Sequence, residues 1–169
     1  MAGKPTRETS QTGDAGVTLG VADSPADLIA VDRLRARAGL ERDGYDTRAL
    51  QICAWEGDTL VGTQRLVLPM PGKRLPVEEG FGLTVEPAGE AVDLGPPALA
   101  TALGAERAKR VADGLLAQAC FETRARGYVV MAGIASSRMA ERYRALGLDV
   151  DVLGRLGDRT AVRLDPSLG

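Results

Sequence analysis

Three carboxylates crowd into six residues in the first half of the chain. Glu41, Asp43 and Asp46 follow an expected helix, and Arg65 precedes the apolar residues Leu66 and Val67 on an expected strand. Acidic groups this close together attract a cation, and Arg65 supplies a counter-charge. The cluster therefore predicts a pocket that binds and orients a small amine. The same residues also fit a structural interpretation, in which the acids end turns and pair with Arg65, and both interpretations stay open.

The absence of histidine limits the proton chemistry that the chain can perform. Its 169 residues include no histidine and only two cysteines, which excludes Ser-His-Asp and Cys-His catalysis. A carboxylate, a tyrosine or water must therefore move any proton. Asp93, in an expected apolar strand, and Tyr143 are among the side chains that could do so. Each has a structural alternative: Asp93 as a solvent-facing strand residue, and Tyr143 as a ring packed on the sheet.

Length and composition indicate one domain with a real core. The chain is 44% hydrophobic and carries a net charge of -2, which gives no sign of a nucleic-acid partner. No apolar run approaches the roughly 20 residues that a membrane-spanning helix needs. Because the N-terminus lacks the apolar segment of a secretory signal, we expect a cytoplasmic protein. Monomer and homodimer both remain open.

Turn and helix-end signals divide the chain into a tail and a domain. Residues 1–16 lack apolar periodicity and are expected to form a disordered tail, whereas residues 17–169 form the domain. Residues 75–87 are ambiguous between a short helix and a strand edge. The remaining elements predict a single α/β (α+β) domain with a mixed, mostly antiparallel sheet and crossover helices. We expect strands at 17–21, 49–55, 59–68, 90–95, 128–135, 148–153 and 160–164, and helices at 26–38, 106–126 and 136–146.

Two features near the middle of the chain bear on phosphate binding. Pro96 and Pro97 are expected to end the strand that carries Asp93, because proline has no N–H for a ladder hydrogen bond. The helix that follows begins with several cations. Free N–H groups at a helix start bind anionic phosphate, and neighbouring cations add to the attraction. A solvated basic turn explains these cations equally well: Arg107, Lys109 and Arg110.

The order of these elements resembles the GNAT (N-acetyltransferase) superfamily. Tyr143 precedes Gly147 and Leu148 as in the helix before the last hairpin of that fold, and Ser136 stands where an asparagine is usual. The resemblance implies helices on both faces of the sheet and a splayed gap between the central strands. That gap and the following helix N-terminus would cradle the phosphates and pantetheine of an acyl donor.

A second resemblance concerns the first half of the domain. Glu41, Asp43 and Asp46 repeat the E-x-D-x-x-D spacing of acyl-homoserine-lactone synthases and N-acyl amino acid synthases. Residues 62–66 are similar to their G-x-x-R-L strand, in which Arg65 is the arginine. The chain departs from these families at residues 93–96, which read D-L-G-P where they have E-L-S-R. It also lacks a counterpart of the aromatic S-adenosylmethionine pocket and of the usual R/Q-x-x-G-x-G/A phosphate loop.

These resemblances imply an N-acyltransferase. Its donor would be acyl-CoA, with an acetyl or longer chain, or acyl-phosphopantetheine on an acyl carrier protein, and its acceptor the amine of a small molecule. In direct attack, Asp93 would take the ammonium proton and Tyr143 would protonate the leaving thiolate, without a metal. Two alternatives stay open: an acyl-homoserine-lactone synthase that uses S-adenosylmethionine, and a non-catalytic GNAT-like module that binds an acyl thioester or a protein.

Overall fold

The computed structural model describes residues 16–167. The tail predicted for residues 1–16 lies outside this range except for Gly16, as do residues 168–169 of the predicted domain. The described chain forms β1 (Val17–Val21), α1 (Pro25–Arg37), the 3-10 turn η1 (Asp46–Arg48), β2 (Ala49–Glu56), β3 (Thr59–Val67), α2 (Pro76–Phe81), β4 (Ala91–Leu99), α3 (Ala105–Ala125), β5 (Val130–Ser136), α4 (Ser137–Ala145), β6 (Val150–Leu156) and β7 (Arg159–Leu164).

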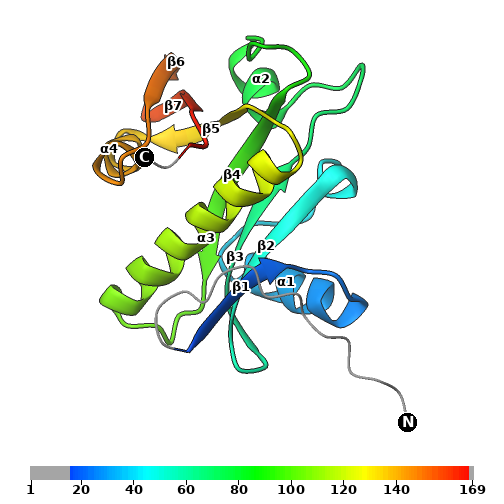
Figure 1. The fold of residues 1–169 in the computed structure, drawn as a ribbon, viewed down its shortest axis with the longest axis vertical. Helices are drawn as coiled ribbons and strands as arrows, with labels where there is room; N and C mark the ends of the chain where they lie inside the picture. Colours follow the sequence, from blue (N-terminus) through cyan, green and yellow to red (C-terminus); the bar gives the residue numbers. More distant parts are fainter. Residues whose placement is uncertain (1–15, 168–169) are drawn as a thin grey trace.

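A single seven-stranded sheet forms the centre of the molecule. Its strand order is β1-β2-β3-β4-β5-β7-β6, and only the β4–β5 pair is parallel. The predicted mixed, mostly antiparallel sheet is therefore confirmed. The parallel pair requires a crossover connection. Helix α3 supplies it, because it follows β4 and precedes β5 in the chain and runs along the sheet (Figure 1).

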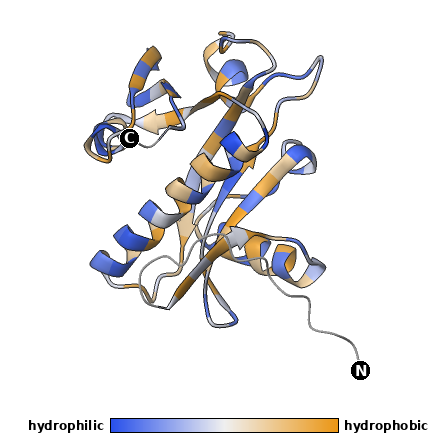
Figure 2. Cartoon of the chain, in the orientation of Figure 1, coloured by the Kyte–Doolittle hydropathy of each residue, from blue (hydrophilic) through white to orange (hydrophobic). Residues whose placement is uncertain are grey.

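Helices cover both faces of this sheet. One buried cluster joins α3 and α4 to one face of the strands, with Leu66, Val92 and Leu94 among its members. A second cluster joins α2 to the other face through Val67 and Ala91, and α1 packs on that face near β2. Because successive strand residues point to opposite faces, Asp93 and Leu94 must face different layers. In Figure 2 the strands carry hydrophobic stretches at the centre, whereas the N-terminal end of α3 is hydrophilic.

The helix ends follow from local chemistry that the sequence shows. Ser24 accepts a hydrogen bond from the Asp27 N–H at 3.1 Å at the start of α1, with proline at the first helical position. Ser136 caps α4 in the same way through the Met139 N–H, also at 3.1 Å. Gly147 follows α4 with a φ of 88°, a conformation that glycine adopts without strain. These boundaries match the predicted ones to within about two residues.

The sheet parts between its two central strands. β4 and β5 pair only from Ala91–Val130 to Asp93–Ala132; beyond that point β4 stays with β3, and β5 stays with β7. Figure 1 shows β5, β6 and β7 turning away from β4. A Cβ atom at position 133 would lie 2.6 Å from the Leu94 carbonyl oxygen. Only glycine therefore permits the close backbone approach at the vertex of this gap.

The prediction that Pro96 and Pro97 end their strand is wrong. β4 continues past them in contact with β3: Leu66 lies opposite Leu94 and Gln64 lies opposite Pro97, so β4 has one residue more than β3 in this stretch. The extra residue makes a bulge, where ladder hydrogen bonds are interrupted and proline is tolerated. The β4–β5 pairing nevertheless stops at Asp93, which leaves the gap between the central strands that the resemblance implies.

The ambiguous stretch at residues 75–87 forms one short helix and no strand. Pro76 occupies the first turn of α2, and Gly82 ends the helix in the left-handed conformation. The last hairpin also differs from prediction, since β6 spans Val150–Leu156 rather than residues 148–153. These differences lie at the edges of elements and leave the strand order unchanged.

Replacement of Gly133 tests the vertex of the gap. Gly133→Ala should lower the free energy of unfolding by about 1–3 kcal/mol, because the new methyl group collides with the Leu94 backbone. Gly95→Ala is the matched control, because its Cβ would make only ordinary contacts, with Arg65 backbone oxygen at 3.6 Å. Chemical denaturation of both variants measures the effect. Equal stability of the two would show that the close approach is not a real constraint.

Candidate active site

A narrow crevice lies beside the gap, on the sheet face covered by α3 and α4. It has room for about 10 Å³ of solvent, roughly the space of one water molecule. Side chains from β3, β4, α3 and α4 meet there, so four segments far apart in the sequence build one site. They are Gln64, Pro97, Ala112, Asp113, Leu116, Met139, Arg142 and Tyr143.

Tyr143 lines this crevice from α4. Its side chain is 8% exposed, and burial raises the pKa of its phenol to about 12. The phenol therefore keeps its proton at neutral pH. Among residues 16–167 its hydroxyl has no hydrogen-bond partner. A protonated hydroxyl without a partner among the described residues can donate a hydrogen bond to a ligand in the crevice. A ring that served packing alone would not require a hydroxyl at this position.

Gln64 is a crevice residue that the sequence analysis did not single out. Its Nε2 donates to the Gly95 carbonyl oxygen at 2.8 Å, whereas its Oε1 has no partner among the described residues. The residue is only 3% exposed, and buried acceptors are normally satisfied. The sequence signal for Gln64 was its place on β3 between Gly62 and Leu66. Both of these residues face the α3 core, so the polar residue midway between them faces the same side.

An ion-pair cluster joins α3 to α4 at the same crevice. Arg142 donates to the Asp113 carboxylate and, at 3.2 Å, to the Lys109 carbonyl oxygen. The Lys109 ammonium lies 3.9 Å from the second Asp113 oxygen. These contacts hold the two helices together across the crevice. A ligand larger than a water molecule therefore requires the helices to part.

The predicted phosphate cations lie in the first two turns of α3. Arg107 pairs with Glu56 of β2, and Lys109 belongs to the cluster around Asp113; Arg110 is on the same helix. Gly104 precedes the helix and provides no side-chain cap. The first N–H groups of α3 can therefore receive an anion.

Asp93 lies on the opposite face of the sheet from Tyr143. It is 3% exposed and accepts a hydrogen bond at 2.8 Å from the Val77 N–H, in the first turn of α2. Burial raises the pKa of Asp93 to about 7, although the Val77 N–H and the Arg65 guanidinium oppose the rise. The solvent-facing interpretation of Asp93 is therefore wrong. At neutral pH both the charged and the neutral forms are populated.

The acidic cluster is largely occupied by arginines. Asp46 lies 2.7 Å from the Arg35 guanidinium and 3.4 Å from that of Arg65, and it accepts from Gln51 Nε2 at 3.2 Å. Burial acts to raise the pKa of Asp46, but the Asp43 N–H and Arg35 hold it below its usual value. Arg35 was not among the predicted residues. Its place in the last turn of α1, next to the acid-rich loop, was the signal for it.

The other two acids of the cluster differ from Asp46 in their surroundings. Asp43 accepts from Arg65 at 2.7 Å with a side chain 43% exposed, and the Arg65 guanidinium also lies 5.7 Å from the centre of the Tyr45 ring. Glu41 is exposed. The structure thus brings Asp43, Asp46 and Arg65 together as the sequence predicts, in contacts that tie the loop to α1 and β3.

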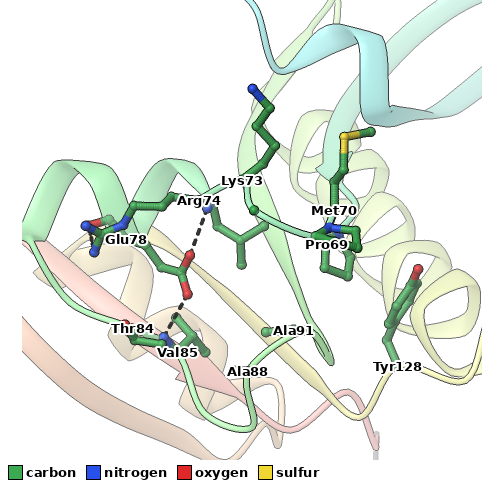
Figure 3. A pocket seen from close by; sticks show the side chains of 14 residues that line it. Pro69, Met70, Lys73, Arg74, Glu78, Thr84, Val85, Ala88, Ala91 and Tyr128 are labelled. Carbon is green, nitrogen blue, oxygen red and sulfur yellow. Dashed lines mark hydrogen bonds between the residues drawn. The ribbon is translucent and has the colours of Figure 1, made fainter.

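Two neighbouring cavities open on the α2 face. The larger holds about 600 Å³ between the 69–75 loop, the 84–89 loop and Tyr128 (Figure 3). Glu78 fixes its wall by accepting from the Leu75 and Val85 N–H groups, each at 2.9 Å. A second cavity of about 420 Å³ shares some of its lining and is bounded also by Tyr45, Arg48 and Glu79; the shared residues are Met70, Lys73 and Arg74. None of these cavity residues was among the predicted site residues.

No cluster of metal-ligating side chains and no helix able to span a membrane occurs within residues 16–167. No group of three or more Cys, Asp or Glu side chains is placed to hold a metal ion there. None of the helices in that range combines the length and the apolar character required to span a membrane.

The acidic cluster yields a comparison between two of its members. Asp46→Ala should lower the free energy of unfolding by about 3 kcal/mol, because it leaves Arg35 without its buried carboxylate. Glu41→Ala should change it by less than about 0.5 kcal/mol, as expected for an exposed residue. Urea denaturation measures both. Similar losses for the two variants would contradict the structural role of Asp46.

Asp93 should make stability depend on pH in a defined direction. The folded protein keeps a proton on Asp93 up to about pH 7, whereas the unfolded chain releases it at 3.8. Stability from this group is therefore complete below about pH 4 and falls as pH rises through about 7. Asp93→Asn keeps an acceptor for the Val77 N–H and removes the fall, a relative gain of up to about 4 kcal/mol at pH 8.

Denaturation across pH 4 to 8 tests this expectation, with Asp149→Asn as the control for removing an exposed carboxylate. If the difference between Asp93→Asn and wild type stays constant with pH, Asp93 does not titrate in this range.

Known structures share this fold. No protein-family model and no curated protein matches the sequence. The CoA-dependent acyl-homoserine lactone synthase MesI is 25% identical over 76% of this chain and 68% of its own, with a TM-score of 0.62. The AHL synthase LasI is 18% identical over 89% of each chain, with a TM-score of 0.68. YncA of Salmonella typhimurium, assigned as an acetyltransferase and solved with acetyl-CoA, is 19% identical over 90% of this chain and 95% of its own, with a TM-score of 0.61.

These neighbours agree with the two resemblances drawn from the sequence. They include AHL synthases and GNAT-family acetyltransferases. The parted central strands and the tyrosine on α4 are features of this structure that do not depend on the comparison. The chain therefore has the fold of the GNAT superfamily, in the branch that resembles the acyl-homoserine lactone synthases.

Proposed function

We propose that this protein is an N-acyltransferase that moves an acyl group from a pantetheine thioester to the amine of a small molecule. One observation carries the proposal. The two groups suited to proton transfer, Tyr143 and Asp93, lie on opposite faces of the sheet beside the gap between β4 and β5. A thioester on the α3 and α4 face and an amine on the α2 face would meet through that gap.

The α3 and α4 face supports the donor half of this proposal. The uncapped start of α3 and the cations of its first turns suit the phosphates of CoA or of a carrier-protein arm. Tyr143 is among the residues that line the crevice on this face. Acetyl-CoA in the YncA structure and the CoA dependence of MesI point to the same donor chemistry. CoA and a carrier protein share this phosphopantetheine group.

The α2 face supports the acceptor half. An ammonium must lose a proton before its nitrogen can attack, and the pKa of Asp93 near 7 suits it as the acceptor of that proton at neutral pH. The two cavities on this face give a small molecule room to bind. Lys73 and Arg74 line both cavities, and Arg48 lines the second. These cations favour an acceptor that also carries an anionic group.

The reaction follows from these positions. Asp93 takes a proton from the ammonium, directly or through water, and the free amine attacks the thioester carbonyl carbon. The C–N bond forms and the C–S bond breaks, so that the electron pair leaves on sulfur. Tyr143 donates its proton or a hydrogen bond to that thiolate. The acylated nitrogen releases its second proton as the amide forms, which balances the proton taken up by sulfur. The products are an amide and a free thiol, and no enzyme nucleophile is required.

A second candidate is an acyl-homoserine-lactone synthase that uses S-adenosylmethionine. The observation that favours it is the number of AHL synthases among the structural neighbours, of which BjaI and TofI were solved with MTA. In that case the amine would belong to the S-adenosylmethionine bound on the acceptor side. Selective thermal stabilisation by this compound, and MTA release in the presence of an acyl thioester, would favour it over the general N-acyltransferase.

Tyr143→Phe tests the proposed acid. Acetyl-CoA or octanoyl-CoA should raise the melting temperature of the wild-type protein, since a ligand of the native state stabilises it. Thiol release measured with a panel of amines should then fall about 100-fold or more in kcat for Tyr143→Phe, with little change in donor affinity. Asp149→Asn is the control, because Asp149 is exposed and lines neither the crevice nor the two cavities.

The outcomes separate the candidate functions. Stabilisation by acyl-CoA without thiol release for any amine would favour the non-catalytic module. Unchanged turnover in Tyr143→Phe would remove Tyr143 from the mechanism while leaving acyl transfer in place.

A further inference from the structure

The side chain of Gln64 is held in one orientation inside the crevice. Its Nε2 donates to the Gly95 carbonyl oxygen at 2.8 Å, so the amide cannot turn over without losing that bond. The opposite atom, Oε1, has no partner among the described residues although the residue is 3% exposed. A buried acceptor without a donor is unfavourable. A ligand that brings an N–H group to this oxygen would satisfy it.

The neighbouring backbone of β4 is poorly suited to pair with an extended ligand as another strand would. An extended ligand can bind along a free strand edge through backbone hydrogen bonds. Here Pro96 and Pro97 have no N–H to donate, and the carbonyl oxygen of Gly95 already accepts from Gln64. The backbone therefore offers a ligand few N–H donors at this point, and Gln64 Oε1 is a buried acceptor of the crevice lining that has no partner among the described residues.

We propose that Gln64 positions the acyl donor by accepting a hydrogen bond from the amide N–H nearest the thioester sulfur of the pantetheine arm. This inference rests on the proposed function. In pantetheine that amide nitrogen is separated from the sulfur by two methylene groups. Gln64 and Tyr143 line the same crevice, so one can bind the N–H while the hydroxyl of the other reaches the sulfur.

The contacts around the crevice define what binding must change. The space of about 10 Å³ is too small for the arm, and the Arg142–Asp113 ion pair joins α3 and α4 beside it. The helices must therefore move apart as the arm enters. Gln64 lies on β3, a central strand paired on both sides, so its oxygen keeps its place while the helices move.

A comparison of two ligands with three proteins tests the proposal. The ligands are octanoyl-pantetheine and an analogue in which CH2 replaces the N–H of the amide nearest the sulfur. Calorimetry measures their dissociation constants, without the need for an acceptor, for wild type, Gln64→Leu and Gln118→Leu. Gln118 is the matched control, because its Oε1 is also buried without a partner among the described residues and it does not line the crevice.

Wild type should bind the amide compound about 10-fold more tightly than the analogue. Gln64→Leu should reduce this ratio to about 1, because it removes the acceptor of the ligand N–H. Gln118→Leu should retain the ratio, because Gln118 does not line the crevice and has no contact with that N–H. Equal binding of the two ligands by wild type, or an unchanged ratio in Gln64→Leu, would overturn the role of Gln64 and leave the acyltransferase proposal intact. If wild type binds neither compound nor acetyl-CoA, the donor site itself is wrong and both proposals fail. Should Gln64→Leu not fold, Gln64→Met takes its place, because it also removes the acceptor oxygen and keeps a side chain of similar length.

Discussion

The early end of the β4–β5 pairing is the constraint on which the rest of the site depends. The two strands share only three residue pairs. Gly133 lets their backbones approach at the vertex, and the bulge at Gly95 and Pro96 keeps β4 on β3 rather than on β5. Beyond Asp93 and Ala132, the backbone groups that a continuous sheet would pair between β4 and β5 face a gap instead. The site is therefore built from an interruption of regular hydrogen bonding, which proline and glycine make possible.

The two faces of the sheet contribute different physical environments to that gap. The face toward α3 and α4 offers a protonated phenol, an unpaired amide oxygen and a helix N-terminus, all suited to a neutral thioester with anionic phosphates. The face toward α2 offers the carboxyl of Asp93, with a pKa near 7, and cavities lined by cations. Between them, the Asp46 network fixes α1 and the following loop to β3 through Arg35 and Arg65. Asp43 and Asp46, two of the acids that suggested an amine pocket, thus organise the scaffold.

Much of the fold could be predicted because its signals are local. Ser24 and Ser136 begin helices, glycines end them, and the turn between β2 and β3 sets a hairpin; each depends on residues within a few positions. The fate of Pro96 and Pro97 could not be read in this way. Whether proline ends a strand depends on which neighbour its edge faces, and that is a property of the assembled sheet. The burial of Asp93 under α2 escaped prediction for the same reason.

The sequence by itself determined the kind of chemistry open to this protein and the branch of the superfamily that it resembles. Without histidine, proton transfer falls to carboxyl and phenol groups, and the spacing of the acids with Arg65 identifies the relatives. Only the tertiary structure decided that Tyr143 and Asp93 face opposite sides of one gap, that Arg35 pairs with Asp46, and that Gln64 Oε1 has no partner among the described residues. The physical reason is distance along the chain: these relations join residues on separate elements, and only packing brings such groups together and sets their burial and charge.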